Sequence, residues 1–249
     1  MNTITKSFLL VSLLSLSPCF SAFAEPPFLV TESAIPIDKQ SYRMDGGLQY
    51  NKASTDITIL SAALRYGLIN NLEVVATLPY LFANNKDRSD SQFGDVLLGA
   101  KVRFIKGREA NPLSIGGAMQ VKLPFGSTND LFETTGKADV GFVALASKEI
   151  PPYEAHLNIG YTLVGKDASD RRSYAIGVDY KEFRENLSLM GELFGTTNNS
   201  GPSHDNWSGA IGAYSFVRSD IRLDTALAIG LSHYAPDYTF NLRGSYFFN

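Results

Sequence analysis

The chain has 249 residues, a formal net charge of −3, and one cysteine, Cys19. Its length suits one large domain or two small ones. Acidic and basic residues are interspersed, so no basic block favours a nucleic-acid partner. No stretch after the N-terminal region is apolar enough for a membrane helix, and a lone cysteine excludes an internal disulfide.

The first 24 residues predict a cleaved secretory signal peptide. Lys6 supplies the positive charge, Phe8–Ser15 forms a short apolar core, and Ala22–Ala24 is an A-x-A cleavage site. The apolar core is too short for a spanning helix, which needs about 20 residues. Cys19 lies within this segment, so we expect an exported mature chain without cysteine. Residues 25–40, which contain three prolines, predict a periplasmic N-terminal leader rather than a domain.

Apolar and polar residues alternate with a period of two through residues 41–249, which predicts strands. In Tyr153–Leu163, for example, Glu154, His156 and Asn158 share one face, and apolar residues share the other. The predicted strands span 42–51, 55–66, 71–81, 93–105, 112–123, 138–148, 153–164, 172–181, 186–195, 206–217, 220–231 and 237–248.

The length of these segments favours a membrane over water. A strand in a soluble protein averages about five or six residues, whereas a tilted strand that crosses a bilayer needs about 9–11. Every second connection between the predicted strands is short, and several of the connections in between are longer and polar. Outer-membrane barrels show this alternation, with short periplasmic turns and longer external loops. A soluble periplasmic sandwich would need shorter strands and polar outer faces. The sequence therefore predicts an all-β fold, a transmembrane antiparallel up-and-down β-barrel of about 12 strands in the outer membrane of a Gram-negative bacterium.

Aromatic residues near the strand ends predict the girdles of such a barrel. They are Tyr50, Tyr66, Tyr80, Phe104, Tyr153, Tyr161, Tyr180, Trp207 and Tyr238. The last segment alternates through Tyr246 and Phe248, and a final strand that closes on an aromatic resembles the signal read by the outer-membrane barrel insertion machinery. We expect that machinery and membrane lipid as partners.

Charged and polar residues on the inner face are candidates for pore lining. They are Arg43, Asp45, Arg65, Glu73, Asp95, Lys101, Arg103, Lys122, Glu154, His156, Asp179, Lys181, Glu192, Arg222, Asp224 and Arg243. Two interpretations stay open: a selectivity lining for a small solute, or a structural network of mixed charges that pair with one another. We expect Asp95 and Lys101 to pair with Arg65, Glu73 or Lys122.

A hydrolase is a further alternative. His156 is the best candidate base, with Asn158 on its face and Ser147 or Ser173 in flanking strands. Ser–His–acid chemistry needs all three groups within hydrogen-bond reach, which the sequence does not fix, and no G-x-S-x-G element occurs. The histidines also lack the spacing of a metal site. We therefore expect no enzyme activity, cofactor or metal.

Several motifs resemble the family of outer-membrane transporters named after the meta-pathway of phenol degradation. The resemblance covers residues 41–249 and rests on Arg65–Leu68 followed by Asn71–Glu73, then Leu78–Tyr80, Phe93–Lys101, Leu123–Gly126, Asp139–Gly141 and His156–Tyr161. It implies a barrel, outer-membrane placement and passage of small, in part aromatic, compounds. No substrate-binding residue is carried over from it.

The favoured function is passive passage of a small-molecule solute across the outer membrane. One alternative is a structural or surface-binding barrel without transport, whose loops bind partners, and the second is a barrel lipid hydrolase. Nucleic acid is not an expected partner.

Overall fold

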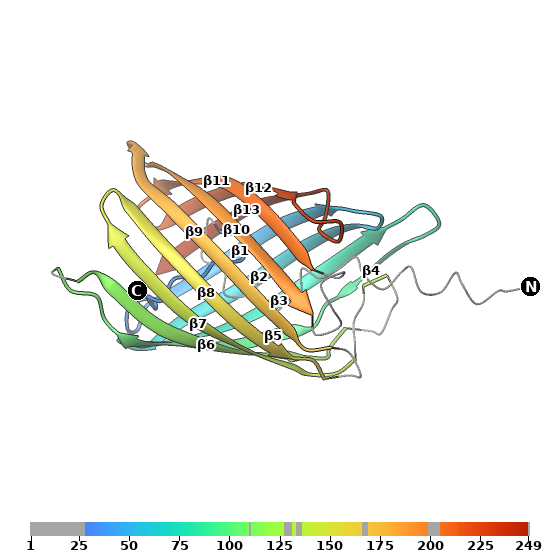
Figure 1. Ribbon diagram of the computed structural model, residues 1–249, viewed down its shortest axis with the longest axis horizontal. Helices are drawn as coiled ribbons and strands as arrows, with labels where there is room; N and C mark the ends of the chain where they lie inside the picture. The colour runs from blue at the N-terminus through green and yellow to red at the C-terminus, as the bar shows by residue number, and fades with distance from the viewer. Residues whose placement is uncertain are drawn as a thin grey trace, which may run out of the picture.

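The computed structural model describes residues 28–109, 111–126, 131–132, 136–165, 169–198 and 205–248. The predicted signal peptide with Cys19, and most of the loop around 127–135, lie outside the described residues. Within them the fold is all-β (Figure 1). The strands are β1 (Tyr42–Lys52), β2 (Asp56–Ile69), β3 (Leu72–Asn84), β4 (Ser89–Phe93), β5 (Val96–Ile105), β6 (Leu113–Leu123), β7 (Asp139–Ile150), β8 (Tyr153–Leu163), β9 (Arg171–Arg184), β10 (Leu187–Asn198), β11 (Asn206–Arg218), β12 (Ile221–Gly230) and β13 (Tyr238–Phe248).

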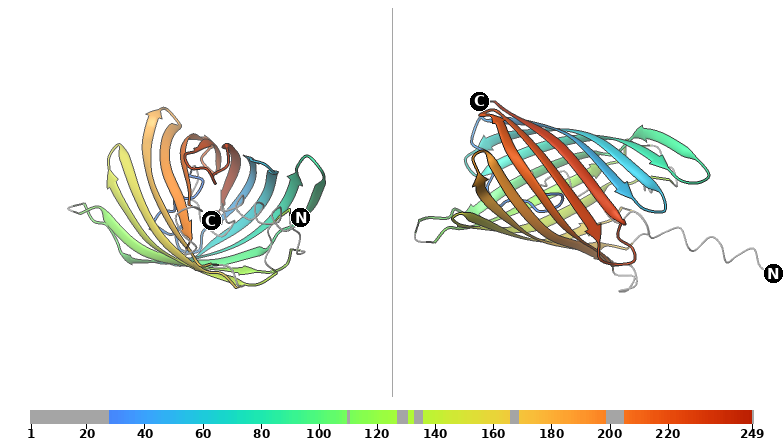
Figure 2. Two further views of the ribbon diagram at one scale, coloured as in Figure 1. Left: turned by 45° about the vertical axis from the view of Figure 1, so that its right-hand side comes forward. Right: turned by 90° about the horizontal axis from the view of Figure 1, so that it is seen from above.

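Twelve of these strands close into an antiparallel barrel. Each pairs with its sequence neighbours, and β1 also pairs with β13, in a register that joins Tyr42 to Phe248. Closure leaves no open edge, so the backbone groups are satisfied without water, as a bilayer requires. Figure 2 shows the tilted strands wound around one interior. The described residues contain no helix that is long and apolar enough to span a membrane.

The strand predicted at 93–105 differs from the structure. It begins only at Val96, because Gly94 and Asp95 interrupt the ladder and the Gly94 amide donates to the Pro79 carbonyl. The preceding residues form β4, which the sequence predicted as loop and which pairs with the outer part of β3. The turn between these two strands is held by the Asn85 side chain, which accepts from two following backbone amides. β4 therefore extends the β3 hairpin beyond the barrel.

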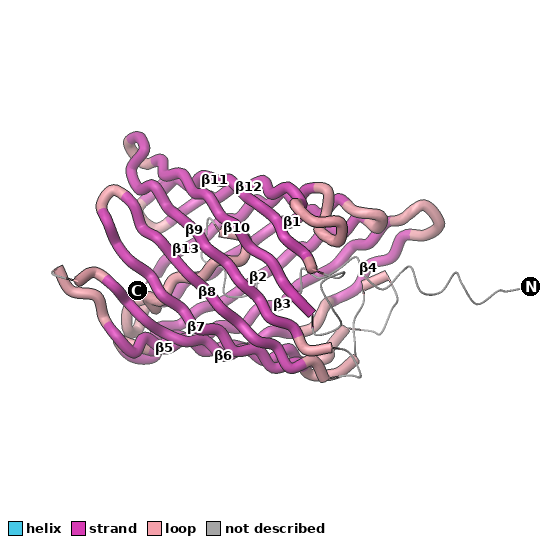
Figure 3. The backbone as a smooth tube through the Cα atoms, viewed as in Figure 1, coloured by secondary structure: helices cyan, strands magenta, loops and turns pink. Residues whose placement is uncertain are grey.

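The two barrel ends differ in their connections (Figure 3). The short-turn end carries four links of two residues, 70–71, 151–152, 185–186 and 219–220, and one longer link, 106–112. The long-loop end carries the short link 53–55, the β4 hairpin and the longer links 124–138, 164–170, 199–205 and 231–237. By the general rule for outer-membrane barrels, the short-turn end faces the periplasm. Tyr42 and Phe248 both lie at the short-turn end, as expected for an even number of barrel strands.

Alternate residues face lipid and the barrel interior. On β8, Leu157 and Ile159 are 48% and 51% exposed, whereas His156 and Asn158, which alternate with them, are buried. The outer surface is therefore apolar and the interior largely polar, which confirms the predicted strand faces.

Aromatic contacts mark both ends of the apolar band and confirm the predicted girdles. At the short-turn end Tyr42 stacks on Tyr66 and Tyr153 stacks on Tyr180. At the long-loop end Tyr50 contacts Tyr238, and Tyr174 stacks on Trp207 at 6.1 Å.

Candidate functional site: the plugged barrel interior

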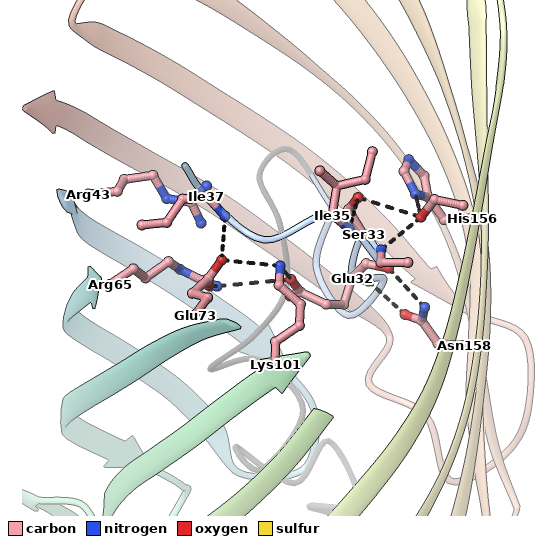
Figure 4. Close-up of polar contacts among 12 residues, drawn as sticks. Glu32, Ser33, Ile35, Ile37, Arg43, Arg65, Glu73, Lys101, His156 and Asn158 are labelled. Atoms are coloured by element: carbon pink, nitrogen blue, oxygen red, sulfur yellow. Dashed lines mark hydrogen bonds and ion pairs between the residues drawn. The ribbon is translucent and has the colours of Figure 1, made fainter. Parts of the chain in front are cut away.

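Residues 28–37, which we call the plug, lie inside the barrel. Phe28 is 3% exposed, and Thr31 and Ala34 are fully buried. Figure 4 shows this segment running between inward-facing side chains of the wall. The sequence predicted a periplasmic leader over residues 25–40; most of its described part instead fills the lumen. The reason is that its backbone amides find hydrogen-bond acceptors on the wall, and its apolar side chains find apolar residues there.

The first anchor of the plug is Glu192 on β10. One carboxylate oxygen accepts from the Leu29 amide at 2.9 Å, and the other accepts from the Val30 amide at 3.0 Å. The Thr31 amide and hydroxyl also donate to this second oxygen, the hydroxyl at 2.6 Å. Hydrogen bonds to a charged group are stronger than neutral ones. A buried carboxylate is therefore stabilised by donors that the plug supplies.

The second anchor lies on β7 and β8. The Glu32 amide donates to the Asn158 side-chain oxygen at 2.6 Å, and the Asn158 amide returns a bond to the Glu32 carbonyl at 2.9 Å. The Ala34 amide donates to the Ser147 hydroxyl at 2.8 Å. Side chains of the wall thus form the hydrogen bonds with the plug backbone that a neighbouring strand would otherwise form.

The third anchor is a network of buried charges on β1, β2, β3 and β5. Arg65 contacts Glu73 at 2.9 Å and Asp45 at 3.1 Å. Lys101 lies 3.4 Å from Glu73 and 2.5 Å from Glu32 of the plug. The Ile37 amide also donates to Glu73, at 2.9 Å. The plug thus contributes both an anion and a donor to a network that the strands otherwise build themselves.

Apolar contacts hold the start of the plug against β9–β12. Phe28 and Leu29 pack with inward-facing small and apolar residues, namely Ala175, Met190, Phe194, Ala210, Ala226 and Ala228. Gly177 makes room for the Phe28 ring, since a Cβ atom built on it would lie 2.7 Å from that ring. The His156 ring meets Phe28 edge-to-face at a centroid distance of 5.3 Å. This wall therefore already accommodates an aromatic ring, and we call the place between Gly177 and His156 the seat of Phe28.

The predicted inward charges lie within the barrel wall as two groups. Twelve of the sixteen candidate pore-lining residues are buried: Arg43, Asp45, Arg65, Glu73, Asp95, Lys101, Lys122, Glu154, His156, Asp179, Glu192 and Asp224. Arg103, Arg222 and Arg243 are half-buried. Arg103 reaches the Asn70 carbonyl at the short-turn end, and Arg222 pairs with Asp224 at 3.1 Å. Arg243 donates to the Phe28 carbonyl of the plug at 2.8 Å.

Several expected pairs form. Lys101 pairs with Glu73, and Lys122 lies 3.4 Å from Asp95 and 2.7 Å from Asp139. Lys181, which the sequence also placed inward, bonds Glu154 at 2.6 Å but is more exposed. Both charge pairing and plug contacts therefore occupy these residues in the structure.

Between the plug and β1–β3 a void of about 60 Å³ remains, lined in part by Leu29, Arg65 and Asn241. At the long-loop end, Leu131 and Phe132 pack on Ile57, Leu81 and Ala83. The void has room for a few water molecules, since about 10–15 Å³ of such volume holds one.

The hydrolase alternative can be compared with the geometry. Ser147 and His156 do meet, with 2.9 Å between the hydroxyl and Nδ1, and Glu154 lies 4.0 Å from Nε2. The Ser147 hydroxyl is buried and accepts the Ala34 amide, while Glu154 bonds Lys181. Ser147 and its partners therefore act here as an anchor of the plug.

Sequence reasoning missed the plug itself. Its only signal in the sequence was a pair of prolines, followed by the apolar run Phe28–Val30 and then by a short polar stretch. That pattern is too short for a strand of this barrel, and nothing local says which wall residues accept its amides.

Comparisons with known proteins agree with this architecture. Residues 31–248 match the family described as "Putative MetA-pathway of phenol degradation". No curated protein matches the sequence.

Among solved structures, an outer membrane channel from Pseudomonas putida F1 superposes with a TM-score of 0.68 at 16% identity, over 90% of this chain and 100% of that one. The KdgM porin gives 0.59 at 10% identity, over 83% and 99%. The CymD monoaromatic hydrocarbon channel gives 0.53 at 9% identity, over 84% and 88%. These likenesses show the fold; the neighbours named are an outer membrane channel, a porin and a monoaromatic hydrocarbon channel. The closed barrel with its apolar outer face is itself of the kind that spans the outer membrane.

Proposed function

This chain belongs to the family described as "Putative MetA-pathway of phenol degradation", and on that premise we propose that it is an outer-membrane channel closed by its plug. When the plug leaves, small molecules with an aromatic or apolar part pass through the interior without energy coupling. The related folds named above are channels and porins, which supports the coarser part of this proposal.

The observation that carries the proposal is the way the plug is held. Its hydrogen bonds run to side chains such as Glu192, Asn158 and Glu73, from three different parts of the wall. The barrel strands pair with one another and not with the plug. The plug can therefore leave without breaking the strand ladder that holds the barrel closed, which is what a removable closure requires.

The seat of Phe28 supports the aromatic part of the proposal. Its ring lies on Gly177 and against the His156 edge, on a wall of small apolar residues. Aromatic rings favour such edge-to-face contacts. Once Phe28 is withdrawn, the same seat accepts the ring of a solute, and the side chains of Arg243 and Asn158, which now bond the plug backbone, face its polar group.

Deletion of residues 28–37 tests the closure. In planar bilayers we expect the full mature chain to stay closed and the deletion variant to show long-lived openings. Heat-modifiable gel migration checks that both barrels are folded. A folded deletion variant without conductance would mean that the barrel is structural or binds partners through its loops, and equal conductance of both chains would overturn the role of the plug.

A separate measurement tests which class of solute passes through the channel. Reversal potentials of the deletion variant compare sodium benzoate with sodium gluconate, and we expect the aromatic anion to be the more permeant. Equal permeability would remove the aromatic preference and leave the channel proposal standing.

A further inference from the structure

An apolar groove crosses the outer surface of the barrel over β3 and β5–β9. It has a volume of about 690 Å³ and is lined almost wholly by apolar groups. Its floor consists of small outward-facing residues, Gly117 and Ala144, and its sides include Phe104, Met119 and Phe142. The strands concerned can be followed in Figures 1 and 2.

The register explains the course of the groove. Two cross-strand rows lie side by side, one running Ala100, Met119, Phe142, Tyr161, Arg172 and the other Leu72, Val102, Gly117, Ala144, Ile159, Tyr174. The middle of the second row has almost no side-chain volume, whereas the flanking row carries Met119 and Phe142. A furrow perpendicular to the strands results.

The furrow runs from the long-loop end of the barrel toward the short-turn end. Leu72 begins β3 at the short-turn end, and Arg172 is the second residue of β9 at the long-loop end. From β3 to β9 there are five strand spacings, and at about 4.8 Å each they give roughly 24 Å. With strands tilted by about 35–45°, the descent is roughly 15 Å, or half of a hydrocarbon core of about 30 Å.

The upper end of the groove carries one positive charge. Arg172 is exposed and forms no ion pair with any described residue. The neighbouring Asp170 carboxylate is engaged by the Tyr161 hydroxyl at 2.7 Å and by the Val164 amide. Tyr174, stacked on Trp207, places this end at the aromatic girdle, the depth of lipid headgroups.

We propose that this groove binds one acyl chain of lipid A in the outer leaflet, with Arg172 on a lipid phosphate. An apolar furrow that descends roughly 15 Å from headgroup depth fits an acyl chain, and an exposed guanidinium at headgroup depth fits a phosphate. Orientation follows the rule that the long-loop end faces outward. The site lies outside the barrel and does not rest on the proposed passage function.

Native mass spectrometry of the detergent-folded mature chain, titrated with purified lipid A, tests the site. We expect saturable retention of one lipid A per monomer. Ala144→Phe fills the furrow floor and Arg172→Gln removes the charge, and each should weaken retention about tenfold. Dephosphorylated lipid A should bind wild type and Arg172→Gln equally.

Matched controls are available on other outward positions. Ala62→Phe adds the same ring on β2, and Arg184→Gln removes an exposed arginine at the short-turn end; both should retain lipid A as wild type does. Heat-modifiable migration verifies folding of every variant. The proposal is overturned if wild type retains no lipid A, if either groove variant retains it unchanged, or if Ala144→Phe instead dissociates a dimer of the chain.

Discussion

The two walls of the barrel interior bury their side chains in different ways. The wall of β1–β3 and β5 is charged, and its ions pair largely with one another, as Arg65 does with Glu73 and Asp45. The wall of β9–β12 presents small and apolar residues together with Glu192, which has no cationic partner among the described residues. The plug touches both walls, but only the second depends on it for cover and for the donors that stabilise its carboxylate.

The two walls therefore have different roles: ion pairs of the first wall stabilise the barrel, and contacts between the second wall and the plug close it. Ion pairs between neighbouring strands remain when the plug leaves, apart from the contribution of Glu32. The apolar wall, by contrast, loses its cover and becomes available to another molecule. Substitutions on the first wall should therefore change barrel stability most, and substitutions on the second should change closure most.

The largest effect is expected for Glu73→Gln. Glu73 is fully buried and neutralises Arg65 and Lys101. Removing one partner of a buried pair leaves an uncompensated charge, so the free energy of unfolding should fall by about 3–5 kcal/mol. Urea unfolding in detergent, followed by gel migration, measures it.

The control is the Lys52–Asp56 pair at the long-loop end, whose lysine side chain is 41% exposed. Lys52→Ala should leave the free energy of unfolding almost unchanged, because solvent screens an exposed pair. If both variants lose the same stability, the charged wall is not the structural one.

An intermediate effect, on closure rather than on the barrel, is expected for Glu192→Ala. It removes the acceptor of four hydrogen bonds from the plug. A net loss of about 3 kcal/mol would raise the open fraction roughly 100-fold. Single-channel open probability measures this change.

Glu192→Gln keeps one acceptor oxygen and should raise the open probability less. A Glu192→Ala channel as closed as wild type would show that packing alone retains the plug.

The smallest effect is expected for Gly177→Ala. The added methyl group would lie 2.7 Å from the Phe28 ring and displace it, which costs about 1–2 kcal/mol of plug seating. Open probability should rise about tenfold. Gly191 on β10 has no atom within 4 Å of its added Cβ, so Gly191→Ala should behave as wild type. Equal open probabilities of the two variants would contradict the fitted seat.

Period-two alternation and strand length by themselves determined the barrel. Whether a side chain faces lipid or lumen depends only on its position along its own strand, so the inward placement of Arg65, Lys101 and His156 follows from local pattern. The aromatic girdles follow for the same reason, since they lie where each long segment ends.

Only the tertiary structure decided which inward groups meet. Glu73 and Lys101 are paired by the ladder between β3 and β5, but Glu192 and Asn158 find their partners in a segment more than 120 residues away. The plug has no periodicity of its own, and the interruption at Gly94 depends on the carbonyl of Pro79. Such contacts depend on how distant parts of the chain are brought together when the barrel closes, which no local pattern records.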